Sequence, residues 1–159
     1  MNPPDKKVDM NVMDSIKKSR GDGPKKEMNS VEIIQEAIQP YLSSGINPQT
    51  FLSKVAGWLQ TPTNKLLQVN NTVYFLTKMS DEVCNVGFLS VDNEKDLIQS
   101  LGGMTKALKN EGFKKLTGYA NDPKYVDVVK KADIGAKIDQ GSKMVGEQAQ
   151  PVYTFEVDL

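Results

Sequence analysis

Residues that usually carry chemistry are scarce in this chain of 159 residues. It has one cysteine, Cys84, and no histidine. The usual base that activates a nucleophile is therefore missing, and Cys/His zinc sites are excluded. Cys84 lies next to Val83 and close to Val86, so we predict a small buried side chain. The alternative, a reactive thiolate, would need an electropositive setting.

Three carboxylates, Asp92, Glu94 and Asp96, alternate along one short stretch. They could bind a hard cation, but the stretch lacks the glycine turn and distal Glu of a calcium loop. Acidic side chains are also favoured at the first turn of a helix by its dipole. We therefore interpret them as acids at a helix start, and we expect no metal site.

The charge balance argues against a dedicated nucleic-acid or membrane-surface binder. Lys plus Arg is 20 and Asp plus Glu is 20, whereas such binders need a positive field. A moderately basic region lies between residues 106 and 137. We interpret this basic region as the solvated faces of helices. The alternative is a surface that binds nucleic acid, but few aromatic residues are present to stack on bases.

Hydrophobic periodicity and turn residues predict one α/β domain over residues 30–159, with a mixed, mainly antiparallel sheet and flanking helices. Ser30 is the expected N-cap of the first helix, and Asn93 that of a long helix over 94–111. A polar loop is expected over 139–151. The predicted helices are 30–42, 48–59, 94–111 and 124–132, and the predicted strands are 66–69, 72–76, 83–91, 113–120, 134–138 and 152–158.

Residues 1–29 are predicted to be an extended N-terminal arm. They hold seven Lys or Arg against five Asp or Glu and no aromatic residue, too little apolar surface to fold alone. One interpretation is a solubilising tail. The other is an arm that docks on a neighbouring protein through its apolar side chains, which are Val8, Met10, Val12, Met13 and Ile16.

From Ser30 to Leu159 the element order resembles the GNAT superfamily of N-acetyltransferases. The local signature is Tyr119-Ala120-Asn121-Asp122-Pro123, then a short helix, then Ile134-Gly135-Ala136. In that family an Asn ends the strand after the long helix, and a Gly-aromatic pair opens the next strand. The resemblance implies the fold, and it implies an acetyl-CoA site whose pyrophosphate rests on backbone amides at the start of the long helix.

The residues that would carry this activity depart from the family pattern. The stretch from Val91 to Leu97 contains no glycine and is acidic. An alternative places the phosphate loop at Gly102 and Gly103, with a later helix start. The family's general acid, a Tyr in the short helix, is matched by Val128 or Val129, and Tyr125 comes a turn too early. We predict no catalytic residue.

These observations favour a non-enzymatic structural or binding subunit of a protein assembly. Catalytically silent domains of this kind occur among bacteriophage virion proteins, so a virion or cytoplasmic location is expected, with neither secretion nor a transmembrane segment. Other proteins are the expected partners, and no small-molecule substrate is expected. Two alternatives are an acetyltransferase that binds acetyl-CoA at a divergent site, and a small regulatory protein that binds a host enzyme.

Overall fold

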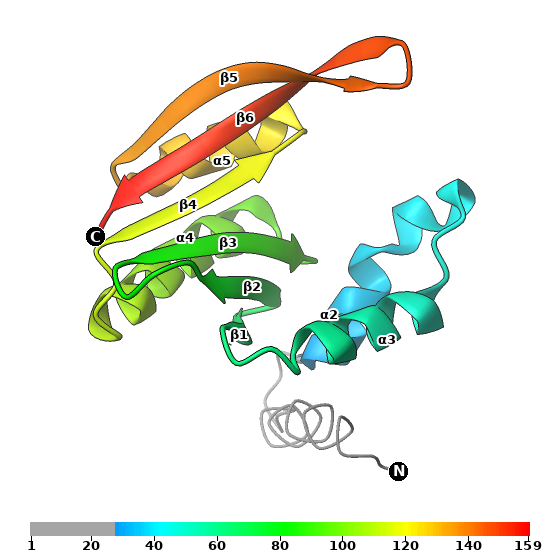
Figure 1. Ribbon diagram of the computed structural model, residues 1–159, viewed down its shortest axis with the longest axis horizontal. Helices are drawn as coiled ribbons and strands as arrows, with labels where there is room; N and C mark the ends of the chain where they lie inside the picture. Colours follow the sequence, from blue (N-terminus) through cyan, green and yellow to red (C-terminus); the bar gives the residue numbers. More distant parts are fainter. Residues whose placement is uncertain (1–27) are drawn as a thin grey trace. The chain divides into compact units, whose positions relative to one another are not determined.

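The computed structural model describes residues 28–159 and divides them into two compact units (Figure 1). The N-terminal unit comprises residues 28–75 and 88–92, and the C-terminal unit comprises 76–87 and 93–159. One six-stranded sheet has the order β1-β2-β3-β4-β6-β5, and strands β2 and β3 contribute residues to both units. The predicted fold class, a mainly antiparallel sheet with flanking helices, is confirmed. The proposed docking residues Val8, Met10, Val12, Met13 and Ile16 lie outside the described residues.

The N-terminal unit begins with two helices and a hairpin. Its elements are α2 (Ser30–Ala37), the 3-10 helix η1 (Gln39–Ser44), α3 (Pro48–Trp58), β1 (Asn64–Val69), the start of β2 (Thr72–Lys78) and the end of β3 (Val83–Ser90). The apolar stripe of α2 buries Ile33 and Ile34 against Val73 of β2. Phe51 and Leu52 of α3 pack on the same cluster, so one small core holds both helices to the hairpin.

The N-cap of α2 is Asn29, and the prediction of Ser30 was wrong. The Asn29 side chain accepts a hydrogen bond from the Glu32 amide at 2.8 Å, and the Glu32 carboxylate accepts one from the Asn29 amide at 3.0 Å. This reciprocal capping box satisfies two amides at once. The Ser30 hydroxyl instead donates to Gln68 at 2.7 Å.

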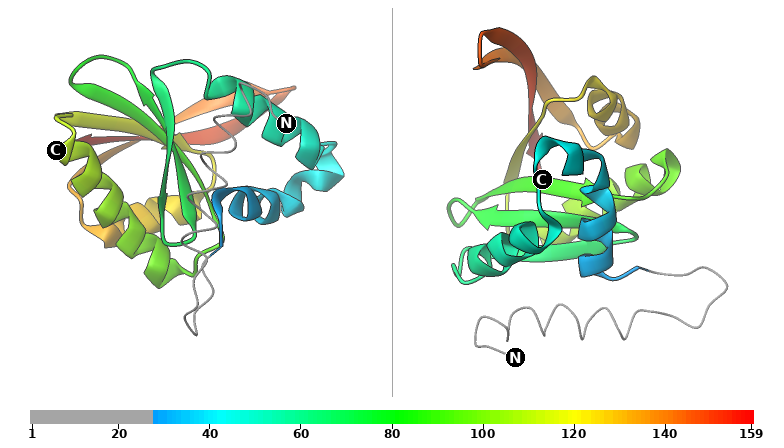
Figure 2. Two further views of the ribbon diagram at one scale, coloured as in Figure 1. Left: turned by 90° about the horizontal axis from the view of Figure 1, so that it is seen from below. Right: turned by 90° about the vertical axis from the view of Figure 1, so that its right-hand side faces the viewer.

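The C-terminal unit places two helices on one side of its strands. Its elements are the rest of β2 and β3, α4 (Glu94–Asn110), β4 (Lys115–Ala120), α5 (Pro123–Ala132), β5 (Ala136–Val145) and β6 (Gln148–Asp158). Strand β4 is parallel to β3 and antiparallel to β6, which also pairs with β5. Helices α4 and α5 lie side by side (Figures 1 and 2). The buried apolar residues of this unit include Leu101, Met104, Leu108, Leu116, Val128, Val129, Phe155 and Val157.

The prediction of a loop over 139–151 is wrong. Most of this segment forms the far half of a long hairpin. The register of β5 and β6 runs from Ala136 opposite Val157 to Val145 opposite Gln148, and Gly146 turns the chain at φ +66°. From Gln140 to Pro151 the side chains are exposed on both faces. No face is buried, so no apolar alternation marks the strands.

Among the helices of residues 28–159, none combines the length and apolar character needed to cross a membrane.

Candidate functional site

The first turn of α4 is capped by its own side chains. Helix α4 begins at Glu94, with Asn93 as its N-cap as predicted. The Asn93 Oδ1 atom accepts from the Asp96 amide at 2.8 Å, and its Nδ2 atom donates to the Asp96 carboxylate at 3.3 Å. Glu94 forms an ion pair with Lys131 of α5. This helix start therefore carries negative side chains and an amide that already has an acceptor.

Asp92, predicted with Glu94 and Asp96 as an acid of this helix, belongs to a different cluster. It lies in the N-terminal unit, where its carboxylate accepts hydrogen bonds from the Asn71 amide at 3.0 Å and the Thr72 hydroxyl at 2.7 Å. Its own amide donates to the Ser90 hydroxyl at 3.0 Å. Asp92 thus ties the start of β2 to the end of β3.

Gly102 and Gly103 lie inside α4, which runs without a break from Glu94 to Asn110. Amides in the middle of a helix donate to carbonyls four residues earlier and are not presented to a ligand. A phosphate loop at these glycines would need a later helix start than the one observed. At Gly102, the position that a Cβ atom would take also has no neighbouring atom within 4 Å.

None of the positions that the resemblance or the sequence suggests for a general acid or nucleophile combines a suitable side chain with full exposure to solvent. Val128 and Val129 of α5 are buried. Tyr125 is half-buried, and the Lys124 amino group lies 5.1 Å from its ring centroid, within range of a cation–π contact. Cys84 is 1% exposed, which confirms the prediction of a buried thiol.

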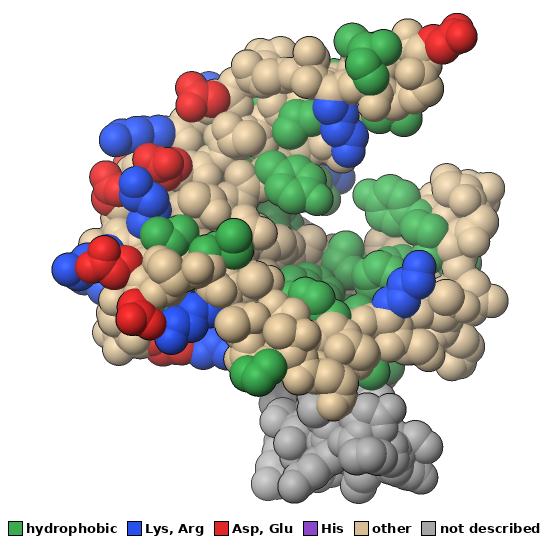
Figure 3. Space-filling view, viewed as in Figure 1, with side chains coloured by type: hydrophobic (Ala, Val, Ile, Leu, Met, Phe, Trp, Pro, Cys, Tyr) green, Lys and Arg blue, Asp and Glu red, His purple; other side chains and the backbone are tan. Residues whose placement is uncertain are grey.

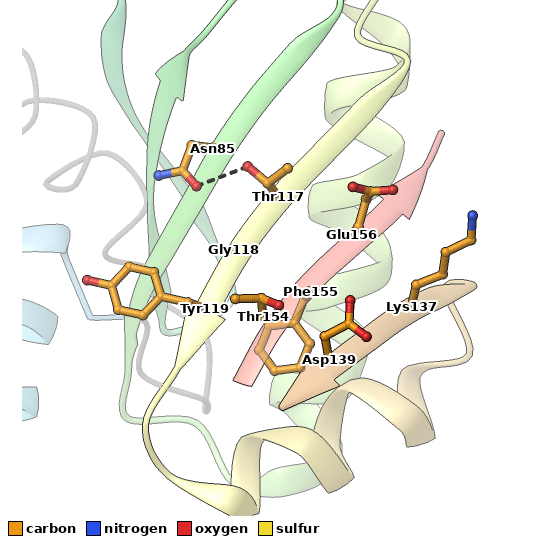
Figure 4. Close-up of a pocket in the computed structure, with 9 residues that line it drawn as sticks. All are labelled: Asn85, Thr117, Gly118, Tyr119, Lys137, Asp139, Thr154, Phe155 and Glu156. Atoms are coloured by element: carbon orange, nitrogen blue, oxygen red, sulfur yellow. Dashed lines mark hydrogen bonds between the residues drawn. The ribbon is translucent and has the colours of Figure 1, made fainter. Parts of the chain in front are cut away.

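A cavity of about 360 Å³ lies on the polar face of the C-terminal unit's strands (Figure 4). One row of side chains crosses it, because Asn85, Thr117, Glu156 and Lys137 stand opposite one another on β3, β4, β6 and β5. The Thr117 hydroxyl donates to Asn85 Oδ1 at 3.1 Å. The cavity therefore begins as a flat polar floor built by strand register alone.

A second row completes the cavity with Tyr119, Thr154 and Asp139. Tyr119 is 64% exposed, so its hydroxyl and the face of its ring are open to a ligand. These groups offer hydroxyl donors and a carboxylate, an arrangement that suits a polar or cationic group. The sequence alone does not reveal this site because its residues come from four separate strands. The only signal was the alternation of polar residues at 117, 119, 154 and 156.

Charges around this cavity are paired across the strands. Lys115 lies 3.3 Å from Glu156, and Lys137 lies 3.9 Å from Asp158. Figure 3 shows Lys and Asp or Glu side chains interleaved on the face in view. On the face in view, the Lys and Arg side chains form no continuous basic stripe of the kind that nucleic acid needs. Residues 28–159 also contain no cluster of three or more Cys, Asp or Glu placed to hold a metal ion.

The comparisons with known proteins identify a fold. No family model and no curated protein matches the chain. Among solved structures, it is similar to aminoglycoside 6'-acetyltransferase type Ii (TM-score 0.59, 8% identity, covering 80% of this chain and 88% of that one). It is also similar to a variant of the spermidine N-acetyltransferase SpeG from Vibrio cholerae (0.57, 8%, 80% and 89%).

A third similar structure is the microcin C7 self-immunity acetyltransferase MccE in complex with acetyl-CoA and AMP (TM-score 0.58, 8% identity, 81% of this chain and 87% of that one). All three likenesses extend over most of both chains, at an identity too low to carry over a substrate or a site residue. The chain has the fold of the GNAT acetyltransferases.

Proposed function

We propose that this GNAT-fold chain is a non-enzymatic binding component of a protein assembly. The observation that carries the proposal is the start of α4, where Asn93 caps the Asp96 amide and the carboxylates of Glu94 and Asp96 flank it. In the acetyltransferases that the chain resembles, the corresponding amides receive the pyrophosphate of coenzyme A.

The electrostatic argument is one of like charges. A pyrophosphate brought to this turn would displace the Asn93 side chain and approach two carboxylates. The helix dipole attracts an anion with an equivalent of about half a charge, whereas each nearby carboxylate repels it with a full charge. Lys131 offsets Glu94 in part, because the two form an ion pair. The net effect disfavours the cofactor at this position.

Calorimetric titration of the full chain with acetyl-CoA tests this proposal. We expect no saturable heat, and no change in the backbone amide resonances of residues 93–97 on addition of the ligand. An acetyltransferase known to bind acetyl-CoA serves as the positive control. Saturable binding with its largest amide shifts at the start of α4 would refute the proposal.

A paired variant sharpens the test. Replacing both acids, Glu94→Gln with Asp96→Gly, removes the repulsion and supplies a glycine. If charge is what excludes the cofactor, this variant gains measurable affinity for acetyl-CoA. Glu111→Gln, at the other end of the helix, is the matched control and gains none.

The assembly that we propose as the setting is a virus particle such as a phage virion, with Val8, Met10, Val12, Met13 and Ile16 as the contact side chains. Mass spectrometry of purified particles tests this setting, and the expected result is a constant copy number per particle. Recovery of the chain with a host enzyme, and not with particles, would favour the regulatory protein instead.

The acetyltransferase remains the competing function, supported by the fold and by the acetyl-CoA seen in the structure of MccE. Transfer of an acetyl group to a polyamine or aminoglycoside by the wild-type chain would establish it.

A further inference from the structure

Strand β5 is an edge strand of the sheet, and it is long. The sheet order ends in β6-β5, so among the described strands none pairs with the outer side of β5. It runs from Ala136 to Val145 without a proline, and Met144 is 64% exposed and Val145 45%. A long edge without a proline is a template for a further strand.

We propose that β5 pairs antiparallel with β5 of a second copy of this chain, in a register centred on Gly141. In a two-fold pair each residue meets its counterpart on the other side of the centre. This register sets Asp139 opposite Lys143 of the second copy, and it does so twice. It also sets Ile138 opposite Met144 twice. The strand is therefore complementary to itself in both charge and apolar character.

The core face of the sheet restricts the registers that are possible. Apolar Ile138 and polar Asp139 lie on opposite faces of β5 because side chains alternate along a strand. The two copies keep their helix-covered faces on the same side only if the two-fold axis sets one residue directly opposite itself. Each residue then lies opposite a residue an even number of positions away, whose side chain points to the same face. Registers centred between two residues would turn one copy over.

Among the permitted registers that keep most of β5 paired, only the one centred on Gly141 brings opposite charges together. Centring on Gln140 would place Lys137 opposite Lys143, and centring on Asp139 would place that carboxylate against itself. Centring on Ser142 leaves both Asp139 and Lys143 without a charged counterpart. Like charges directly opposite are destabilising, so charge selects the register.

The pairing also covers the exposed apolar side chains of the hairpin. Met144 would lie against half-buried Ile138 of the second copy, and Val145 against the aliphatic stem of Lys137. Asp139, which this register sets opposite Lys143 of the second copy, borders the cavity described above. The dimer would therefore bring Lys143 of the second copy to the rim of that cavity.

Charge reversal on the full-length chain tests the dimer, with sedimentation equilibrium at 0.15 M salt as the measurement. We expect the wild-type chain to show a monomer–dimer equilibrium. Asp139→Lys and Lys143→Asp, each alone, turn two attractive pairs into two repulsive ones and weaken dimerisation by about tenfold or more. The double variant, Asp139→Lys with Lys143→Asp, restores opposite charges and returns the dimer constant close to the wild-type value.

Asp81→Lys, an equal change of charge on the turn between β2 and β3, is the matched control and leaves the equilibrium unchanged. Circular dichroism checks that each variant folds, as expected for exposed positions. A wild-type chain that stays monomeric throughout would overturn the proposal. So would a dimer that ignores the single reversals, or a double variant no better than the singles.

Discussion

The hydroxyl of Thr72 donates a 2.7 Å hydrogen bond to the carboxylate of Asp92, twenty residues further along the chain. Thr72 is fully buried, and its oxygen also lies 2.6 Å from the Ser90 hydroxyl. Because Thr72 donates to Asp92, Ser90 is the donor in that second bond. The pair holds the beginning of β2 to the chain that leaves β3.

Removing this hydroxyl should destabilise the fold. Thr72→Val keeps the shape of the side chain, but it leaves the half-buried Asp92 carboxylate without one donor and the Ser90 hydroxyl without its acceptor. We expect a loss of about 1–3 kcal/mol in the free energy of unfolding. Urea denaturation measures the loss. Thr154→Val, the same replacement at an exposed strand position, is the control and should change the value by no more than about 0.5 kcal/mol. Equal effects at the two positions would contradict the network.

Gly118 is required by the close approach of two strands. In the parallel register of β3 and β4 it lies opposite Val86, and a Cβ atom there would come within 2.8 Å of the Val86 carbonyl oxygen. Gly118→Ala should therefore force the strands apart and cost about 1–3 kcal/mol. The measurement is the unfolding free energy of the purified variant.

The same substitution inside α4 is the matched control and should have the opposite sign. Gly102 has open space where its Cβ would lie, so Gly102→Ala should stabilise the helix by about 0.5–1 kcal/mol. A neutral result at Gly118 would show that the strands there can shift at no cost. Destabilisation at Gly102 would show instead that the helix needs a glycine.

The pKa of Lys131 is raised above its ordinary value of 10.5, first by its hydrogen bond with Glu94 and then by the charge of that residue. Asp127 raises it further, and burial acts in the opposite direction. The ion pair therefore contributes below pH 10.5 and is lost as the pH rises through the higher folded-state value. Titration of isotopically dimethylated lysines by NMR follows this group directly.

In that titration Glu94→Gln should lower the pKa of Lys131, and Asp127→Asn should lower it by a smaller amount. A value unchanged by Glu94→Gln would show that the ion pair does not persist in solution. The matched comparison is Lys114, whose ion-pair partner, Glu82, neither substitution alters.

Local patterns predicted most of the elements and one important cap. The start of α4 depends on atoms three residues apart, Asn93 and Asp96, so its sequence alone was sufficient. The same reasoning placed the first cap one residue late. The spacing of Asn29 and Glu32 is the signal for a capping box, whereas Ser30 only has the advantage that it directly precedes the apolar stripe.

The helix starts, the turns and the absence of histidine chemistry were determined by the sequence itself, because each rests on residue types or on bonds within about four residues. Only the tertiary structure decided that Asp92 joins Thr72 and not α4, and that residues 139–151 extend a hairpin. Both outcomes depend on pairing between distant segments. A strand exposed on both faces carries no periodicity, and a carboxylate between two elements can bond to either one.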